Sequence, residues 1–202
     1  MTYRRLFPLI AAPALVAAAP AAGDLATVAQ HLAATRSMTA QFSQTDRQGQ
    51  VLDGTLTLKQ PGRLRFQYGQ GVPILIVADG TTLNFVDYSV RQVSPWPIAR
   101  SPLAVLLDPA GDITRYARLV PSGDDRVVSV QAYDRKRPEY GRINLVFVRD
   151  PAAPAGLRMT GWVALDAQGN RTTVRLTAQR YNIPVSDEAF RWDDPRKKPR
   201  PR

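Results

Sequence analysis

Apolar and polar residues alternate along most of this chain, a pattern typical of β-strands that bury one face. In residues 54–59 and 63–68, every second residue is apolar or glycine and the residues between are polar or charged. Pro61 and Gly62 lie between these two runs, and both are favoured in turns. The pattern therefore predicts a β-hairpin whose two strands each have one apolar face.

The period of two begins near Met38 and returns in most of the chain that follows. Further predicted strands cover 72–78, 81–87, 126–133, 142–149, 157–165 and 171–181. Two other segments carry apolar residues at helical spacing and predict a helix over 24–34 and a short helix over 102–107.

The predicted strands follow one another too closely for crossover helices, which favours antiparallel pairing. We therefore expect a mainly β fold with helices (α+β), a single curved antiparallel sheet or incomplete β-barrel. Two short helical segments are little cover for so large a sheet, so the sheet must curl or leave its apolar face partly hollow. Alternation reports which face is buried and not what fills it, so a packed core and a hollow face both remain open.

The N-terminus has the pattern of an export signal. Arg4 and Arg5 precede an uncharged run over 6–22, and Ala19-Pro20-Ala21 places small residues before a cleavage site after Ala21. We expect an export signal over 1–21, one domain over 22–195 and a basic, Pro-rich tail over 196–202. No cysteine follows the signal, so the exported product is predicted to lack a lipid anchor.

The net charge of +10 suggests a nucleic-acid partner, but its distribution argues against one. Of the 27 basic residues, two lie in the predicted signal and five in the tail, which leaves 20 against 17 acidic residues in the body. The run Arg135-Lys136-Arg137 and the tail are the best sites for nucleic acid, yet export removes the chain from it. We therefore predict no nucleic-acid partner.

The residue inventory excludes most catalytic chemistry. The chain has no cysteine and one histidine, His31, so it has no thiolate nucleophile, disulfide or Cys/His zinc site. The acidic pairs at 124–125 and 193–194 are interpreted as solvated loop residues, and His31 as a solvated or cap-proximal side chain of the first helix. Separated turn residues are a weak case for calcium; they are Asp79, Asp87 and Asp108. We predict no enzyme, metal or cofactor.

One string of residues has the order and spacing of a known family. It comprises Phe42-x-Gln44, Gly54-x-Leu56-x-Leu58-Lys59-x-Pro61-Gly62-Arg63-x-Arg65-Phe66, Asp79-Gly80, Asp87, and Pro102 with Leu106-Leu107. This string resembles the LolA-type outer-membrane lipoprotein carriers of Gram-negative bacteria. The resemblance extends over nearly all of the chain after the predicted signal.

The resemblance implies a periplasmic, monomeric carrier with a helical lid over an apolar cavity. Its implied partners are acylated lipoproteins, an inner-membrane lipoprotein-releasing transporter and an outer-membrane acceptor lipoprotein. By strand parity, we expect the cavity wall to consist of Leu56, Leu58, Leu64, Phe66, Ile74, Ile76, Leu83 and Phe85. The lid or its neighbourhood would hold Leu103, Leu106 and Leu107. For each of these residues, ordinary core packing is the alternative interpretation.

Gln60 is a departure from the family pattern, because members often carry a basic residue immediately before this proline, linked with the closed lid. Gln60 is still able to donate hydrogen bonds to lid carbonyls, without charge assistance. We therefore predict a looser latch at Gln60, or a latch moved to Arg63 or Arg65. Parity places both arginines on the opposite face from Phe66.

Other members of this fold would fit the same pattern. A related lipid-binding module could carry glycolipid or other envelope lipids, and an envelope lipoprotein sensor could report mislocalised lipoproteins. Sensors of this kind usually have an additional domain, for which this length leaves little room. The basic tail is interpreted either as a contact for anionic headgroups or acidic partners, or as a solubilising terminus.

Overall fold

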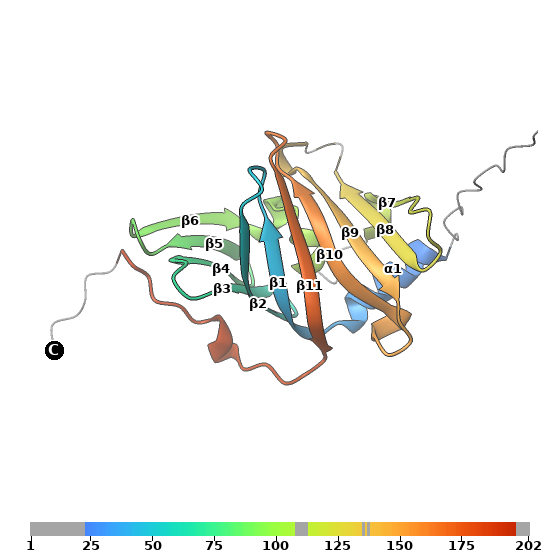
Figure 1. Ribbon diagram of the computed structural model, residues 1–202, viewed down its shortest axis with the longest axis horizontal. Helices are drawn as coiled ribbons and strands as arrows, with labels where there is room; N and C mark the ends of the chain where they lie inside the picture. Colours follow the sequence, from blue (N-terminus) through green and yellow to red (C-terminus); the bar gives the residue numbers. More distant parts are fainter. Residues whose placement is uncertain (1–22, 108–112, 135, 137, 197–202) are drawn as a thin grey trace, which may run out of the picture.

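Eleven antiparallel strands form one sheet in the computed structural model, which describes residues 23–107, 113–134, 136 and 138–196. The strand order is β6-β5-β4-β3-β2-β1-β11-β10-β9-β8-β7 (Figure 1). The strands are β1 (Ser37–Thr45), β2 (Val51–Lys59), β3 (Arg63–Tyr68), β4 (Ile74–Asp79), β5 (Thr82–Asp87), β6 (Gln92–Pro97), β7 (Ala117–Val120), β8 (Val127–Tyr133), β9 (Arg142–Arg149), β10 (Leu157–Leu165) and β11 (Arg171–Tyr181). The pairing of β1 with β11 joins two meanders, and β6 and β7 are the edges of an open sheet.

Short helices accompany the sheet. They are α1 (Asp24–Ala34), α2 (Ala104–Leu107) and the 3₁₀ turns η1 (Ile98–Arg100), η2 (Ile113–Arg115), η3 (Pro138–Tyr140), η4 (Pro154–Gly156) and η5 (Asp187–Phe190). Within the described residues, no helix has the length and apolar character needed to span a bilayer.

The sheet curls strongly about its central strands. Register shifts interrupt the pairing of β1 between Thr39 and Gln41 and of β10 between Met159 and Gly161, and such bulges bend a strand and increase its twist. The curl brings Phe66 on β3 against Trp162 on β10, with ring centroids 6.0 Å apart, although three strands separate β3 from β10. The side chains inside this curl form the larger of two hydrophobic clusters.

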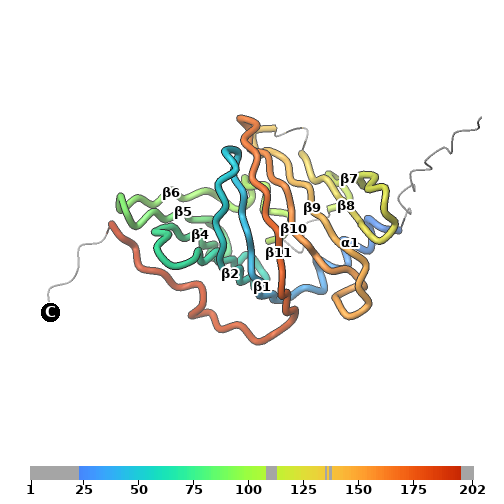
Figure 2. Tube along the Cα trace, viewed as in Figure 1, coloured from blue at the N-terminus to red at the C-terminus, as the bar shows by residue number. Residues whose placement is uncertain are grey.

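The second cluster lies on the opposite face of the sheet. Leu75, Val77 and Val86, from β4 and β5, are buried there against Phe190 of η5. Phe190 belongs to the C-terminal strap, defined here as residues 182–196, which runs back from the end of β11 along β3 and β4 (Figure 2). Both faces of this half of the sheet are therefore covered.

The predicted fold class is confirmed: a curved antiparallel sheet with few helices that does not close into a barrel. The two predicted helices and all predicted strands are present, with ends shifted by a few residues. Strands β6 and β7 were missed. Pro95 and Pro97 lie within β6, and proline argues against a strand except at an edge, which is where β6 lies. β7 has only four residues, too few to show a period. The predicted signal, Asp108 and residues 197–202 lie outside the described residues.

Candidate functional site

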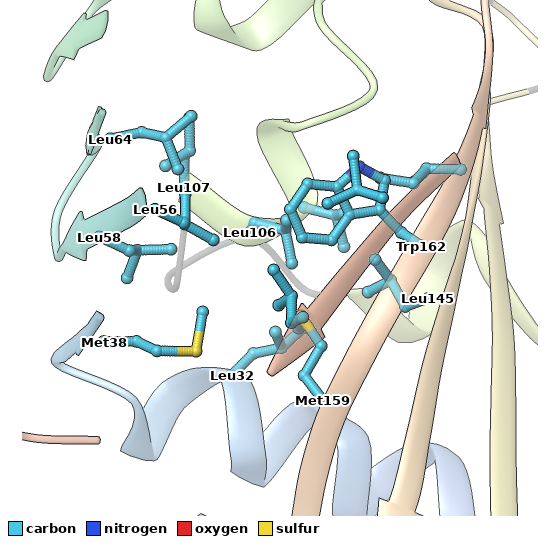
Figure 3. Close-up of a cluster of buried hydrophobic side chains, with 14 of the residues drawn as sticks. Leu32, Met38, Leu56, Leu58, Leu64, Leu106, Leu107, Leu145, Met159 and Trp162 are labelled. Atoms are coloured by element: carbon cyan, nitrogen blue, oxygen red, sulfur yellow. The ribbon is translucent and has the colours of Figure 1, made fainter. Parts of the chain in front are cut away.

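A small, largely enclosed cavity lies between α1, α2 and the inner face of the sheet. Its volume is about 20 Å³, which is room for about one water molecule. The lining residues are His31, Leu32, Thr35, Met38, Leu56, Leu58, Gln60, Leu64, Leu106, Met159 and Trp162. Figure 3 shows the apolar members of this set. In this conformation the protein's own side chains fill most of the curled face.

The hairpin of β2 and β3 supplies one wall of the cavity. Leu56, Leu58 and Leu64 line it and are nearly inaccessible to solvent. Phe66 is buried beside them and forms T-shaped ring pairs with Phe42 and Trp162. These four side chains were predicted from strand parity, and the structure brings them together on one face.

The four predicted wall residues on β4 and β5 lie farther out along the same face. Leu83 is buried in the main cluster, whereas Ile74 and Ile76 pack against it only partly buried. Phe85 pairs with Ile76 across the strands, is partly exposed and belongs to neither cluster. None of the four lines the cavity, so the wall under α2 is shorter than parity alone indicates.

The roof of the cavity is α2. Leu106 points into the cavity between the leucines of β2 and Trp162 (Figure 3). Leu107 is also buried, and Leu103, just before the helix, is partly buried against the same cluster. A helix of four residues has little hydrogen bonding of its own, so its position depends on what it packs against and on contacts from neighbouring segments.

Two hydrogen bonds from the β2–β3 turn reach the carbonyl groups of α2. The Gln60 side-chain amide donates to the Leu106 carbonyl oxygen at 2.6 Å, and the Gly62 backbone amide donates to that of Leu107 at 2.9 Å. Gly62 has φ +70°, and a Cβ there would meet the Gly80 backbone at 2.7 Å, so the turn requires glycine. The Gln60 Oε1 atom is buried and has no hydrogen-bond partner among the described residues.

Arg63 and Arg65 make no such contact with α2, because they point to the opposite face of the sheet. Arg63 pairs with Asp187, and Arg65 donates to the Arg191 carbonyl oxygen at 2.9 Å. Both arginines therefore hold the C-terminal strap, and the prediction of an alternative latch at these residues is wrong.

His31 was predicted to be solvated or close to a helix cap. It is not solvated, since only 1% of it is exposed, but it does lie in the last turn of α1, where its carbonyl accepts from the Thr35 amide. Its Nδ1 lies 2.9 Å from the Pro154 carbonyl oxygen, which only accepts, so Nδ1 carries the proton. Burial lowers the His31 pKa from its usual 6.5, against the opposing effect of the Pro154 and Leu157 carbonyls. His31 is buried because Val28, His31 and Leu32 share the helix face that packs on the sheet, as their spacing in the sequence requires.

Several cavity residues were absent from the predicted wall. Trp162 and Met159 come from β10, Met38 from β1 and Leu32 from α1. Strand parity could have identified Trp162 as inward-facing, but nothing in the sequence shows that β10 curls round to face β3. Among the described residues, no group of three or more His, Cys, Asp or Glu side chains could hold a metal ion.

Comparison with known families gives a match over most of the chain. The model of the family described as outer membrane lipoprotein carrier protein LolA matches residues 33–193. The outer-membrane lipoprotein carrier protein of Chromobacterium violaceum is 26% identical over 203 residues, which covers 95% of each chain. That of Pseudoalteromonas translucida is 26% identical and covers 93% of this chain and 91% of its own.

Solved structures with similar folds have low sequence identity. An uncharacterized conserved protein from Thermus thermophilus has a TM-score of 0.50 and 12% identity, covering 85% of this chain and 94% of its own. A chain of the Pseudomonas aeruginosa MucA/MucB complex has a TM-score of 0.50 and 15% identity, covering 86% of this chain and 62% of its own. At these identities the likeness shows the fold alone.

Proposed function

The chain belongs to the LolA family of outer membrane lipoprotein carrier proteins, and we propose that it carries acylated lipoproteins by taking their acyl chains into the space beneath α2. Members of this family are carriers and not enzymes. The observation that supports the proposal best is the apolar cavity roofed by a four-residue helix, with a glutamine hydrogen bond at its edge.

The cavity surface suits acyl chains. Each buried CH₂ group contributes about 0.8 kcal/mol, so acylated proteins need a cover during passage through water. Leucine, methionine and tryptophan side chains attract acyl chains without directional contacts, which tolerates many different cargo proteins. A wall of this kind selects for the lipid and not for the protein attached to it.

Uptake of cargo must move α2, because a cavity of about 20 Å³ holds no acyl chain. Moving the helix breaks the bonds from Gln60 and Gly62, both neutral and each contributing about 1 kcal/mol. The apolar surface of Leu106 that this exposes is then covered by the incoming chains. Displacement of Leu106 by cargo is thus an exchange of one apolar contact for another.

The chain's exchange partners follow from its family. We propose that it acts as a monomer in the periplasm after removal of residues 1–21, receives lipoproteins from an inner-membrane releasing transporter and delivers them to an outer-membrane acceptor lipoprotein. Release requires an acceptor cavity that binds the acyl chains more tightly, since no energy source is part of the carrier.

Tryptophan fluorescence provides a direct test, because the three tryptophans lie in different places. Trp162 is buried against the cavity, Trp96 is 59% exposed on β6, and Trp192 lies on the strap. In a variant with Trp96→Phe and Trp192→Phe, only Trp162 emits. A synthetic lipopeptide with brominated acyl chains should quench this emission strongly.

The matched control keeps only Trp192, by Trp96→Phe with Trp162→Phe. The same lipopeptide should leave its emission nearly unchanged, because the strap covers the outer face of the sheet. Equal quenching of both variants, or none of either, would show that the acyl chains do not enter the proposed cavity.

The native cargo is identified by native mass spectrometry of the mature protein purified from its own periplasm. Co-purified acylated lipoprotein supports the carrier function. A glycolipid recovered reproducibly in its place, or a phospholipid that competes with the lipopeptide for quenching of Trp162, would replace it with transport of another envelope lipid.

A further inference from the structure

A second hollow lies on the other side of α2, against the strands β8 and β9 and Tyr116, which precedes β7. It is a groove of about 230 Å³ with apolar walls that include Ala99, Val105 and Ile143. Tyr116, Tyr133 and Tyr140 also line it. It shares no lining residue with the cavity beneath α2, because Val105 faces the groove whereas Leu106 faces the cavity.

The groove continues into an open, cationic cleft of about 520 Å³. Tyr116, Tyr133 and Asp134 line both, so the two hollows form one continuous surface. Four cationic side chains line the cleft, against the single carboxylate of Asp134; the four are Arg115, Arg118, Lys136 and Arg142.

Neighbouring residues leave much of this positive charge available. Arg118 Nη2 donates to the Gln131 amide oxygen at 2.6 Å, a neutral partner that orients the guanidinium without cancelling its charge. Among the described residues, no ion pair joins Lys136 or Arg142 to a carboxylate. An anion in the cleft would therefore meet several cationic side chains, of which Arg118 is held in place by Gln131.

We propose that this groove and cleft bind one anionic phospholipid, with its phosphate on the cations of the cleft and an acyl chain in the groove. Guanidinium groups match the oxygens of a phosphate, and tyrosine joins an apolar ring to a polar hydroxyl at the boundary between headgroup and chain. An acidic peptide would use the cleft alone and leave the apolar groove empty. This site goes beyond the carrier function, because it takes a different ligand at different residues.

The probes are short-chain phosphatidylglycerol and phosphatidylcholine, below the concentrations at which they form micelles. Isothermal titration of the mature protein in low salt should detect phosphatidylglycerol binding at least about tenfold tighter than phosphatidylcholine. Equal affinity for both lipids, or no binding of phosphatidylglycerol, would overturn the proposal.

A charge-matched pair of variants locates the site. Lys136→Gln with Arg142→Gln should weaken phosphatidylglycerol binding about tenfold. Arg171→Gln with Arg175→Gln removes the same charge from exposed positions of β11 and should leave binding unchanged. Equal loss in both pairs would mean a general charge effect and no site.

The substitution Ala99→Trp tests the groove separately from the cleft. Ala99 is an exposed lining residue of the groove, so a large ring there would fill the groove without entering the core. This variant should weaken phosphatidylglycerol binding but not binding of inorganic phosphate. If inorganic phosphate or an acidic peptide competes as strongly as the lipid, the cleft is an anion site without lipid specificity and the proposal fails.

The test of the phospholipid site can fail or succeed independently of the test of the carrier function. Quenching of Trp162 by brominated lipopeptide should be the same in Lys136→Gln/Arg142→Gln as in the unaltered cleft. Loss of phosphatidylglycerol binding with quenching retained confirms two independent sites. Absence of Trp162 quenching with phosphatidylglycerol binding retained would refute the carrier function and leave the phospholipid site standing.

Discussion

A short segment covers each face of the sheet, and the two segments are held in place by different kinds of contact. On the inner face, α2 is held over the cavity by Leu106 and by two neutral hydrogen bonds from the β2–β3 turn. On the outer face, the strap is held by Phe190 in a second cluster and by charged groups of β2 and β3. Lys59, Arg63 and Arg65 all contribute to the strap, whereas among the described residues only the uncharged side chain of Gln60 hydrogen-bonds to α2.

On the proposed carrier function, this difference separates a cover that opens for cargo from one that stays closed. A roof that must move for cargo benefits from weak, neutral hydrogen bonds, because breaking them costs little. The Gln60 Oε1 atom, which has no partner among the described residues, adds no further bond to the roof. The strap instead shields Leu75, Val77 and Val86, whose exposure would leave an apolar patch on the surface. The following predictions test this contrast, from the largest effect to the smallest.

Phe190→Ala should lower the free energy of unfolding by about 3 kcal/mol, because Phe190 is 7% exposed and anchors the strap. Urea denaturation measures the loss, and Val90→Ala, at a residue 65% exposed, is the control with almost none. Quenching of Trp162 by brominated lipopeptide should remain, since the strap contacts the other face. Loss of quenching in a folded Phe190→Ala protein would mean that strap and roof act together.

His31 makes the α1 side of the cavity sensitive to acid. Its pKa is lowered in the folded protein, so the unfolded chain binds the proton first as the pH falls below 6.5. Stability is therefore fully present above pH 6.5 and decreases below it, by at most about 1.4 kcal/mol down to pH 5.5. Urea denaturation at pH 7.5 and 5.5 measures this decrease.

His31→Gln is the control, because it cannot titrate in this range. The difference in stability between the two pH values should be smaller in this variant than in the unaltered protein. Carboxylates do not explain the effect, since those with a lowered pKa, such as Asp150, lose their contribution only below 3.8. An equal pH dependence in both proteins would assign it to groups other than His31.

The sequence predicted the inner face better than the outer one. Leu56, Leu58, Leu64 and Phe66 follow a period that depends only on local geometry, and the turn at Gly62 follows from glycine chemistry. The strap could not be predicted in this way, because residues 182–196 have no period of their own. Parity places Leu75 and Val77 on the opposite face of β4 from Ile74 and Ile76, but no local pattern shows that Phe190, more than a hundred residues later, buries them.

The same limit applies to the cavity itself. Alternation identified which face is apolar, but how much of it is filled depends on where α2 rests. That helix packs through Leu106 and accepts hydrogen bonds from Gln60 and Gly62, which are distant in the sequence. His31 shows the reverse case. Val28 and His31 are three residues apart and therefore share a helix face, which indicates that His31 is buried. The prediction of a solvated side chain rested instead on the polarity of histidine.

Gln60→Arg should tighten the roof by about 1 kcal/mol, because a charge-assisted hydrogen bond to a carbonyl is stronger than a neutral one and the unsatisfied Oε1 is removed. The Gly62 amide donates to the Leu107 carbonyl, so its hydrogen exchange reports opening. Exchange at Gly62 should slow about fivefold, and lipopeptide uptake should slow with it.

Gln60→Leu is the paired variant, similar in size but without the hydrogen bond. Exchange at Gly62 should be faster than in the unaltered protein, while global stability changes little because an unsatisfied acceptor is lost together with the bond. Unchanged exchange in both variants would show that Gln60 does not hold α2.

Asp187→Asn should have the smallest effect, although Asp187 pairs with both Lys59 and Arg63. Hydrogen bonds from Lys59 and then Arg63 lower its pKa, but its side chain is 60% exposed, so water and salt screen the pairs. The urea midpoint should shift only slightly at low salt and not at all at high salt. Lys59 also donates to the Val185 carbonyl oxygen at 2.9 Å, a bond that the substitution leaves in place. A loss as large as that of Phe190→Ala would mean that charge, and not the buried ring, keeps the strap closed.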